Sequence, residues 1–347
     1  MRVCFAAPQV IRMIQGGLRT QIGETARYLR ELGVEVEFFD QWREFRREEY
    51  DLFHIFRAST ATFELASYLA NLGVPYVVSP VLYTRRSFGF VRSILKAEDM
   101  VRRIYSGFMS EWGMSRAICT KAGAVLPNTT HEAEFFITGM GIPRSNVTVI
   151  PNGVDSRFAD ADPSLFITTY GMKDFILYVG NIGAERKNAL GFIRAMASTG
   201  YSAVLVGPVY DNAYARQCIE EAHRSGNIHI IGALPNDSPM LASAYAACRV
   251  FVLPSYFETP GIAALEAGLA GAPVVITRHG GTTDYFASFA RYVDPTSTTD
   301  IVQAVRDALQ EPRSETLRDH IRRNFLWQSV AAQTAEMYRK IGLPAAG

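Results

Sequence analysis

The chain of 347 residues is long enough for about two domains of ordinary size. Hydrophobic residues make up 48% of it and charged residues 20%, a composition that is typical of folded globular proteins and argues against a disordered or fibrous chain. Because 35 basic residues are balanced by 34 acidic ones, no overall positive field attracts nucleic acid, and we expect no nucleic-acid partner.

Short apolar runs rich in β-branched residues alternate with longer helical patterns, beginning with a strand at 3–6 and a helix at 17–32. Further strands are predicted at 34–39, 52–56, 76–79, 124–127, 176–179, 203–206, 228–231, 250–253 and 273–276. Because these runs do not alternate with polar residues, each strand should be buried on both faces, as in a parallel sheet covered by helices. Repeated strand–helix units predict a doubly wound α/β fold.

The pattern restarts after the segment 149–155, which contains the turn signal Asn152-Gly153. We therefore expect two Rossmann-like, doubly wound parallel-sheet domains facing a cleft, with a hinge between them. The first domain is predicted over 1–155 and the second over 156–326.

The cysteines predict neither a zinc site nor a disulfide framework, because they are far apart and form no Cys-x-x-Cys pair. No apolar run approaches the ~18 residues of a membrane span. Pro8 and Arg12 interrupt the apolar N-terminus too early for a signal peptide. We expect a cytoplasmic protein, and attachment to the inner face of a membrane stays open.

The strongest chemical signal is the segment 257–268, which follows the predicted strand 250–253. Thr259 is suited to cap a helix and Pro260 to occupy its first position. The backbone N–H groups of Gly261 and Ile262 would then form an anion site at the helix N-terminus, beyond the end of the strand.

Two carboxylates flank this predicted anion site, Glu258 just before the helix and Glu266 inside it. A phosphate between groups that accept hydroxyl hydrogen bonds describes the binding of a nucleotide sugar. The alternative is an ordinary capped helix with a solvated glutamate.

A second signal follows the strand 176–179, where the glycine-rich turn at Gly180-Asn181 leads to Arg186-Lys187-Asn188. Two adjacent cations could neutralise a pyrophosphate leaving group. A solvated helix start is the alternative, but basic residues at a helix N-terminus oppose its dipole unless an anion binds nearby. The pair Gly16-Gly17 after the first strand is a weaker signal, equally compatible with a tight turn and with a ligand loop.

The segment 85–121 carries eight basic and three acidic residues, interleaved with aromatic and apolar ones. Two interpretations are equally open. The segment contacts an anionic lipid headgroup or a lipid-diphosphate acceptor, or it is a solvated face over a core.

Together these motifs resemble a family 4 retaining glycosyltransferase of the GT-B fold. The matching pieces are the Gly16-Gly17 loop, the segment 149–155, the turn at 186–188, the Glu258-x7-Glu266 segment and Phe325-Leu326-Trp327. The Glu-x7-Glu segment is the specific part of this resemblance, and the second half of the chain matches better than the first.

The resemblance implies a role for each motif. Arg186, Lys187 and Glu258 would form the catalytic group, in which the two cations bind the donor diphosphate and Glu258 holds the donor sugar and the distal phosphate. Glu266 would bind the ribose. Further donor contacts would come from Gly16, Gly17, Gly180, Asn181, Leu234, Thr259, Pro260, Gly261 and Ile262. The last helix, at about 327–347, would cross back to complete the first, acceptor-binding domain.

The implied reaction moves a hexosyl group from a UDP- or GDP-linked sugar to a glycan or lipid-linked acceptor, in bacterial polysaccharide or glycoconjugate assembly. No cofactor or metal ion is expected, because Arg186, Lys187 and the helix end near Gly261 would stabilise the leaving group. Asp160-Ala161-Asp162 resembles a metal-binding motif but lies between the domains and not at a strand end. Two departures matter: Asn181 stands where the family often has an arginine, and 76–83 lacks a histidine that the family often carries. His54, one strand earlier, is interpreted as structural. These departures leave a non-catalytic sugar-nucleotide binder open as an alternative. A nucleotide-sugar epimerase on the same two-domain scaffold is a second alternative.

Overall fold

The computed structural model describes residues 1–13, 16–82, 84, 86–105, 107–313 and 315–342, which form two compact units. The first unit ends at Asn152 and resumes at Trp327, and the second comprises Gly153–Leu326. The domain change was predicted at residue 155. Arg85 of the basic segment and residues 343–347 of the predicted last helix lie outside the described residues.

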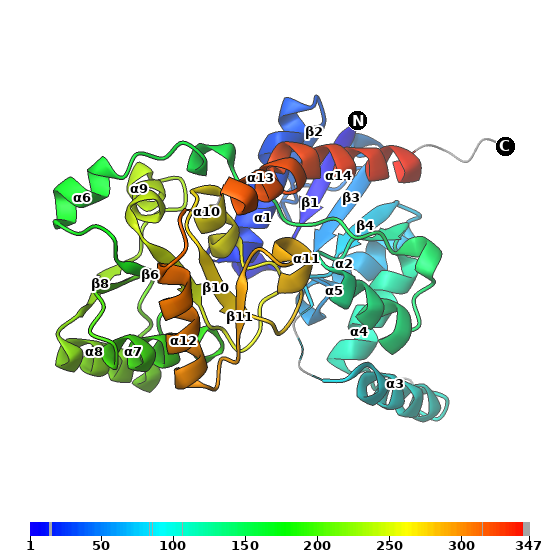
Figure 1. The fold of residues 1–347 in the computed structure, drawn as a ribbon. Coiled ribbons are helices and arrows are strands. Elements are labelled where there is room, and N and C mark those ends of the chain that lie inside the picture. The colour runs from blue at the N-terminus through cyan, green and yellow to red at the C-terminus, as the bar shows by residue number, and fades with distance from the viewer. Residues whose placement is uncertain (14–15, 83, 85, 106, 314, 343–347) are drawn as a thin grey trace. The chain divides into compact units, whose positions relative to one another are not determined.

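The first unit is built on a parallel sheet with the strand order β2-β1-β3-β4-β5 (Figure 1). Its strands are β1 (Arg2–Ala6), β2 (Glu35–Phe38), β3 (Leu52–Phe56), β4 (Tyr76–Ser79) and β5 (Ala124–Val125). Every residue of β3 and β4 is buried, as their unbroken apolar runs predict for strands covered on both faces.

Helices cover both faces of this first sheet. They are α1 (Gly17–Glu31), α2 (Thr60–Asn71), α3 (Phe88–Arg102), α4 (Glu111–Lys121), α5 (Thr130–Glu134) and α14 (Trp327–Gly342). On one face α14 packs against α1, and its Trp327 and Tyr338 join a core with Val3, Phe5 and Phe56. The C-terminal helix is thus an integral part of the first unit.

The second unit contains a six-stranded parallel sheet with the order β11-β10-β9-β6-β7-β8. Its strands are β6 (Ile176–Val179), β7 (Ala203–Val206), β8 (Ile228–Gly232), β9 (Val250–Leu253), β10 (Val274–Thr277) and β11 (Arg291–Val293). The first strand of the unit, β6, lies beside the fourth, β9, so the strand order reverses between them. This arrangement defines a Rossmann-type sheet.

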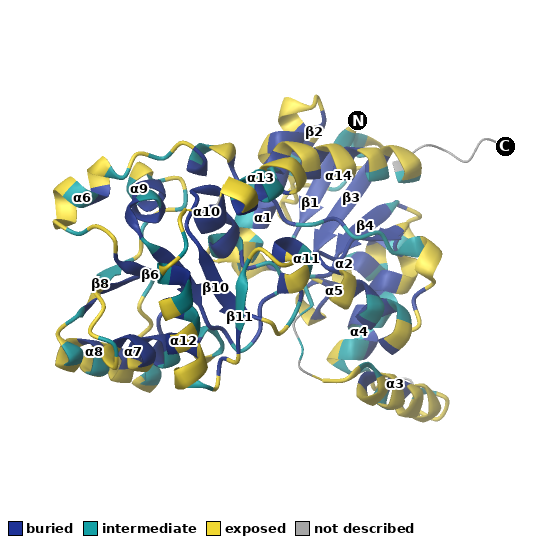
Figure 2. Ribbon diagram, in the orientation of Figure 1, coloured by how far each residue is buried: buried dark blue, intermediate teal, exposed yellow. Residues whose placement is uncertain are grey.

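The helices of the second unit connect these strands, as the alternating pattern predicts. They are α6 (Ser164–Tyr170), α7 (Ala189–Ala197), α8 (Ala213–Ser225), α9 (Pro239–Ala247), α10 (Ile262–Leu269), α11 (Thr282–Phe286), α12 (Thr298–Leu309) and α13 (Glu315–Asn324). In Figure 2 the strands β6, β9 and β10 are almost entirely buried, and exposed residues lie mainly on the helices and the connecting loops.

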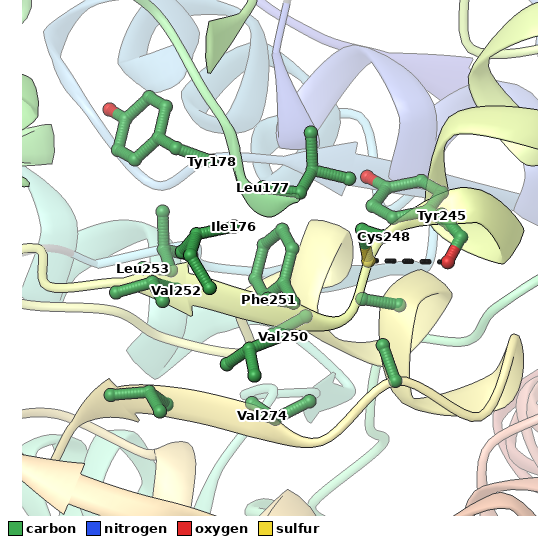
Figure 3. Close-up of a cluster of buried hydrophobic side chains, with 14 of the residues drawn as sticks. Ile176, Leu177, Tyr178, Tyr245, Cys248, Val250, Phe251, Val252, Leu253 and Val274 are labelled. Atoms are coloured by element: carbon green, nitrogen blue, oxygen red, sulfur yellow. Dashed lines mark hydrogen bonds between the residues drawn. The ribbon is translucent and has the colours of Figure 1, made fainter. Parts of the chain in front are cut away.

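Figure 3 shows the centre of this second core, where Leu177 of β6 and Phe251 of β9 pack beside Val274 of β10. The thiol of Cys248 donates a hydrogen bond to the carbonyl of Tyr245 at 3.3 Å. Cys4, Cys119 and Cys218 are likewise buried and free. No helix among the described residues combines the length and the apolar character that crossing a membrane requires.

The two parallel-sheet, Rossmann-like units confirm the predicted fold class, and each predicted strand lies within two residues of an observed one. One observed strand, β11, was not predicted. It has only three residues at a sheet edge, two of them partly exposed, so it carries no apolar run that a sequence pattern could reveal.

Candidate functional site

The candidate site lies in the second unit, beyond the carboxyl ends of β6 and β9. Open parallel sheets bind ligands at the point where the strand order reverses, because the connections on either side leave toward opposite faces. The segment after β6 contains Glu185–Lys187, a short 3-10 helix, and the segment after β9 leads into α10. The two strongest sequence motifs therefore meet at the place where a Rossmann-type sheet binds its ligand.

A buried ion pair joins these two segments. The ammonium of Lys187 lies 2.5 Å from a carboxylate oxygen of Glu258, and the guanidinium of Arg186 lies 3.5 Å from the same oxygen. Arg186 also donates to the carbonyl of Phe257 at 2.7 Å. Only 5% of the Glu258 side chain is exposed, against 19% of Lys187 and 37% of Arg186, so the cations border the open side of the pair.

Each charge of this pair favours the ionised form of its partner. Burial alone would raise the pKa of Glu258, but the nearby Lys187 and Arg186 outweigh it and hold that pKa below its usual range. Burial lowers the pKa of the Lys187 ammonium, an effect that Glu258 opposes. The carboxylate is therefore ionised, and it keeps the partly exposed ammonium of Lys187 in place at the end of the sheet.

Asn188, to which the sequence assigned no role, fixes the turn that carries the two cations. Its side-chain amide donates to the carbonyls of Pro254 at 2.9 Å and Pro295 at 2.8 Å, so it ties the segment after β6 to the segments after β9 and β11. The backbone N–H of Tyr256 in turn donates to the carbonyl of Arg186 at 2.9 Å. The cations therefore stand on a braced turn and not on a free loop.

The backbone of Glu258 is held from the opposite direction by the segment after β10. Its N–H donates to the carbonyl of His279, and its carbonyl accepts from the N–H of Gly281, both at 3.0 Å. Between these bonds Gly280 has a φ of +104°, and a Cβ there would lie 1.9 Å from the Glu258 carbonyl oxygen. Only glycine fits this close approach of two backbone segments.

The start of α10 differs from the prediction. Thr259 does not cap the helix and Pro260 is not its first residue, because α10 begins at Ile262 with Gly261 as its N-cap. Gly261 has a φ of +72°, and this left-handed turn delays the helix by two residues. No side chain caps this end. The N–H of Ala264, in the first turn of α10, donates to the carbonyl of Gly261 at 2.8 Å. The anion site predicted at the N–H groups of Gly261 and Ile262 stays a prediction.

Glu266 is buried one turn inside α10 and is held by two side chains that sequence reasoning missed. Its carboxylate accepts from the Asn236 amide and from the Tyr245 hydroxyl, both at 2.7 Å. Asn236 is itself bound by Arg157, whose guanidinium donates to its backbone carbonyl at 2.8 Å. The ordered carboxylate thus connects α10 with the segment that follows β8.

The other predicted contacts of the second unit lie on the neighbouring loops. Asn181 donates through its amide to the Tyr210 hydroxyl at 2.7 Å, so a neutral, tethered side chain stands at that position. Gly180 lies against Gly207, where a Cβ would meet the Gly180 carbonyl oxygen at 1.9 Å. Leu234 is partly buried against the core. Their contacts with a donor stay predictions.

In the first unit, Gly16 is the N-cap of α1 and Gly17 is its first residue, after the loop that follows β1 and contains the short helix Gln9–Arg12. Gln15 of the same loop lies outside the described residues. The glycine pair therefore opens a helix as predicted, and its approach to a donor stays a prediction.

Two buried polar residues of the first unit have a clear structural environment. His54 lies between the hydroxyls of Tyr338, at 2.5 Å, and Ser79, at 2.8 Å, and burial lowers its pKa to about 3. It is a neutral core histidine. Glu132 accepts from the backbone N–H groups of Leu82 at 2.6 Å and Asn128 at 2.7 Å, and burial raises its pKa to about 7 against the effect of these bonds.

Among the described residues, no group of three His, Cys, Asp or Glu side chains is arranged to hold a metal ion. Asp162 accepts a hydrogen bond at 2.9 Å from the N–H of Ser164, the first residue of α6.

Two family models match the chain in succession. The model described as Glycosyltransferase Family 4 matches residues 38–158, and the model described as Glycosyl transferases group 1 matches residues 166–325. A curated relative, the MMP alpha-(1->4)-mannosyltransferase of Mycolicibacterium hassiacum, is 27% identical over 258 residues. That alignment covers 70% of this chain and 59% of the relative, so the chain spans less than two thirds of the relative's length.

Solved structures support the fold over nearly the whole chain. A sucrose-phosphate synthase from Thermosynechococcus elongatus superposes with a TM-score of 0.75 and 18% identity, covering 98% of both chains. Anabaena HepE in complex with UDP superposes with a TM-score of 0.73 and 18% identity, covering 98% of this chain and 100% of that one.

Proposed function

Because the chain belongs to the group 1 glycosyltransferases of family 4 and has the two Rossmann-like units of the GT-B fold, we propose that it is a retaining hexosyltransferase. In this proposal a UDP- or GDP-linked sugar is the donor, and a glycan or lipid-linked hydroxyl is the acceptor. The observation that carries the proposal is the braced cationic turn of Arg186 and Lys187, paired with buried Glu258 where the strand order reverses.

The chemistry of the leaving group supports this assignment. Transfer breaks the bond between the sugar C1 and a phosphate oxygen, so negative charge develops on the diphosphate. Arg186 and Lys187 would stabilise this charge together with the N–H groups at the start of α10, and fixed donors of this kind act without reorganising during the reaction. No metal ion is required in this scheme.

Retention of configuration needs no protein nucleophile. The acceptor oxygen would form its bond to C1 on the face that the diphosphate leaves, and the acceptor proton would pass to a diphosphate oxygen. Glu258 is a poor candidate for a nucleophile, because its carboxylate is already bound by Lys187 and lies close to Arg186. We assign it to holding the cations and the donor sugar, and Glu266 to the ribose.

Proteins similar to this chain agree with this class of donor and product. One is a mannosyltransferase and another structure holds UDP. We propose polysaccharide or glycoconjugate assembly as the setting, in line with the family resemblance.

The first experiment is a thermal-shift panel with UDP, GDP, ADP, dTDP and CMP on the wild type and on the Lys187→Ala and Glu266→Ala variants. A nucleotide at ~100 times its Kd stabilises the folded state by ~2.7 kcal/mol. One nucleoside diphosphate should stabilise the wild type, and each variant should lose most of that shift relative to its own unliganded Tm. Arg306→Ala, which removes an exposed cation of α12, should retain it.

Turnover of the matching sugar nucleotide with a panel of acceptors follows, with and without EDTA. The proposal expects a product of retained anomeric configuration that EDTA does not suppress. Binding without transfer to any acceptor would favour a non-catalytic sugar-nucleotide binder, and an altered donor sugar without acceptor would favour an epimerase. Loss of product with EDTA would contradict a metal-independent reaction.

A further inference from the structure

The C-terminal end of α3 exposes large apolar side chains next to cations. Met100, Val101, Ile104 and Tyr105 are 69%, 45%, 90% and 65% exposed, and we call these four residues the α3 end cluster. The helical turn continues through the cluster, because the N–H of Tyr105 donates to the carbonyl of Val101 at 2.8 Å. Single exposed apolar residues are normal on a protein surface, but a contiguous group at one helix end indicates an interaction site.

α3 is packed against the protein through its inner face, and the cluster lies on a different side of it. The buried residues of α3 are Val91, Leu95 and Glu98, which recur at helical spacing and face the protein. α3 packs on α4 and on the short helix Phe135–Gly139. In Figure 2 the outward side of α3 is mostly exposed. The cluster therefore lies on the solvent side of a helix whose inner face already has its partners.

Cations accompany the cluster on this outward side. Arg92, Lys96 and Met100 are four residues apart and form one row along α3, with both cations exposed, and Ile104 continues this spacing in the turn after the helix. Arg102 and Arg103 stand within the cluster itself.

The acidic residues of α3 do not cancel these charges. Glu98 is buried and accepts hydrogen bonds from the backbone and side chain of Ser110, and Asp99 is bound by Arg116 of α4. The outward row therefore combines a net positive charge with an apolar end.

We propose that the α3 end cluster docks on the surface of an anionic lipid bilayer. The apolar side chains would enter the boundary between headgroups and acyl chains, while the four cations face the anionic headgroups. A bilayer surface offers both chemistries at once, which is why basic amphipathic helices bind there. Docking would bring the protein to the plane in which lipid-linked hydroxyl groups are found.

Vesicle sedimentation with the purified full chain tests the proposal. Vesicles of phosphatidylcholine alone are compared with equimolar phosphatidylcholine and phosphatidylglycerol, without any sugar nucleotide. The wild type should sediment with the anionic vesicles only, and added salt should release it. Arg102→Gln with Arg103→Gln should weaken partitioning about fivefold for each cation removed.

Two matched controls locate the effect. Met100→Ser with Ile104→Ser should lower partitioning, whereas Ile219→Ser, which alters an exposed apolar residue of α8, should not. Arg322→Gln with Arg323→Gln removes two consecutive arginines from α13, and this double variant should also leave partitioning unchanged. Ile104→Trp should make the protein's fluorescence more sensitive to lipids with brominated acyl chains than that of the wild type.

Three outcomes would overturn the proposal: no sedimentation of the wild type at low salt, equal loss in the control variants, or a dimer in solution that Ile104→Ser dissociates. The last would show that a second copy covers the cluster. Because no sugar nucleotide is present, a negative sedimentation result does not bear on the proposed transferase activity. Conversely, a chain without transferase activity could still bind the anionic vesicles.

Discussion

At the scale of single residues, the ion pair between Lys187 and Glu258 affects both the stability of the fold and the proposed reaction. Removing one partner from a buried pair leaves the other charge uncompensated, which costs more than the pair itself contributes. The same cation is the one that the proposed reaction needs. Substitutions can therefore separate its two roles.

We expect Glu258→Gln to lower both stability and turnover. Lys187 would lose its buried counter-charge, which should cost about 1–3 kcal/mol of the free energy of unfolding, because part of the side chain still reaches solvent. Turnover should fall by ~10²–10³, as on loss of one fixed transition-state contact. Urea unfolding and sugar-nucleotide turnover measure the two effects.

The double variant Lys187→Met with Glu258→Gln is the control. It should recover much of the stability of the single variant and none of the turnover. Recovery of turnover in the double variant would show that neither side chain acts on the leaving group.

Glu132 should make the stability of the first unit depend on pH. Its pKa is raised to about 7, so the folded chain retains a proton that the unfolded chain releases near pH 4.5. The stabilisation is fully present below pH 4.5 and is lost as the pH rises through 7, by up to about 3 kcal/mol.

Glu132→Gln cannot titrate, so its stability should change less over this pH range than that of the wild type. Urea unfolding of both proteins between pH 4.5 and 8 gives the difference, in which the titration of all other groups cancels. Parallel profiles would rule out a titrating Glu132.

Some residues of the candidate site could be predicted from the sequence and others could not, for a physical reason. Arg186, Lys187 and Glu258 could be predicted because each directly follows an apolar strand, and parallel strands end at one edge of a sheet. Asn188, Asn236 and Tyr245 could not, because their contacts join positions 21 to 107 residues apart that no periodicity relates.

At the scale of elements, the strands were the most predictable part of the fold. Their apolar runs follow directly from burial on both faces, and short edge strands such as β11 lack this signal. The start of α10 was mispredicted because Thr259 and Pro260 have the local chemistry of a helix start. The left-handed Gly261 and the pairing of Glu258 with Gly280 outweigh that preference.

The contact between the segments after β9 and β10 leads to a prediction at this scale. Gly280→Ala would place a Cβ against the Glu258 carbonyl and force the two segments apart. We expect a loss of about 3 kcal/mol or more in the free energy of unfolding, together with loss of nucleotide binding. Chemical denaturation and calorimetric titration with nucleoside diphosphates measure both.

Gly226→Ala provides the matched comparison. Gly226 has a φ of +73°, but a Cβ there would meet no atom within 4 Å, so only backbone strain of about 1 kcal/mol is expected and binding should persist. Equal effects of the two substitutions would show that the close approach at Gly280 is unimportant.

At the scale of the whole molecule, each unit has its own sheet and its own core, and α14 belongs to the first. Trp327 is almost fully buried in that first core. We expect Trp327→Ala to cost the first unit about 3–5 kcal/mol.

Hydrogen exchange followed by mass spectrometry would locate this loss. Exchange should accelerate in Leu52–Phe56 and stay unchanged in Ile176–Val179, whereas a bound nucleoside diphosphate should protect the second segment. Equal acceleration in both sheets would show that the chain unfolds as one cooperative body.

The return of α14 to the first unit also bears on how the chain is made. During synthesis the residues of the second unit, 153–326, leave the ribosome as one continuous stretch. The first unit emerges earlier but lacks Trp327 and Tyr338 until α14 has been translated, so its apolar face around Val3 and Phe56 stays uncovered until then. The half of the protein that is translated first is therefore the half that finishes folding last, and chaperone protection matters most for that face.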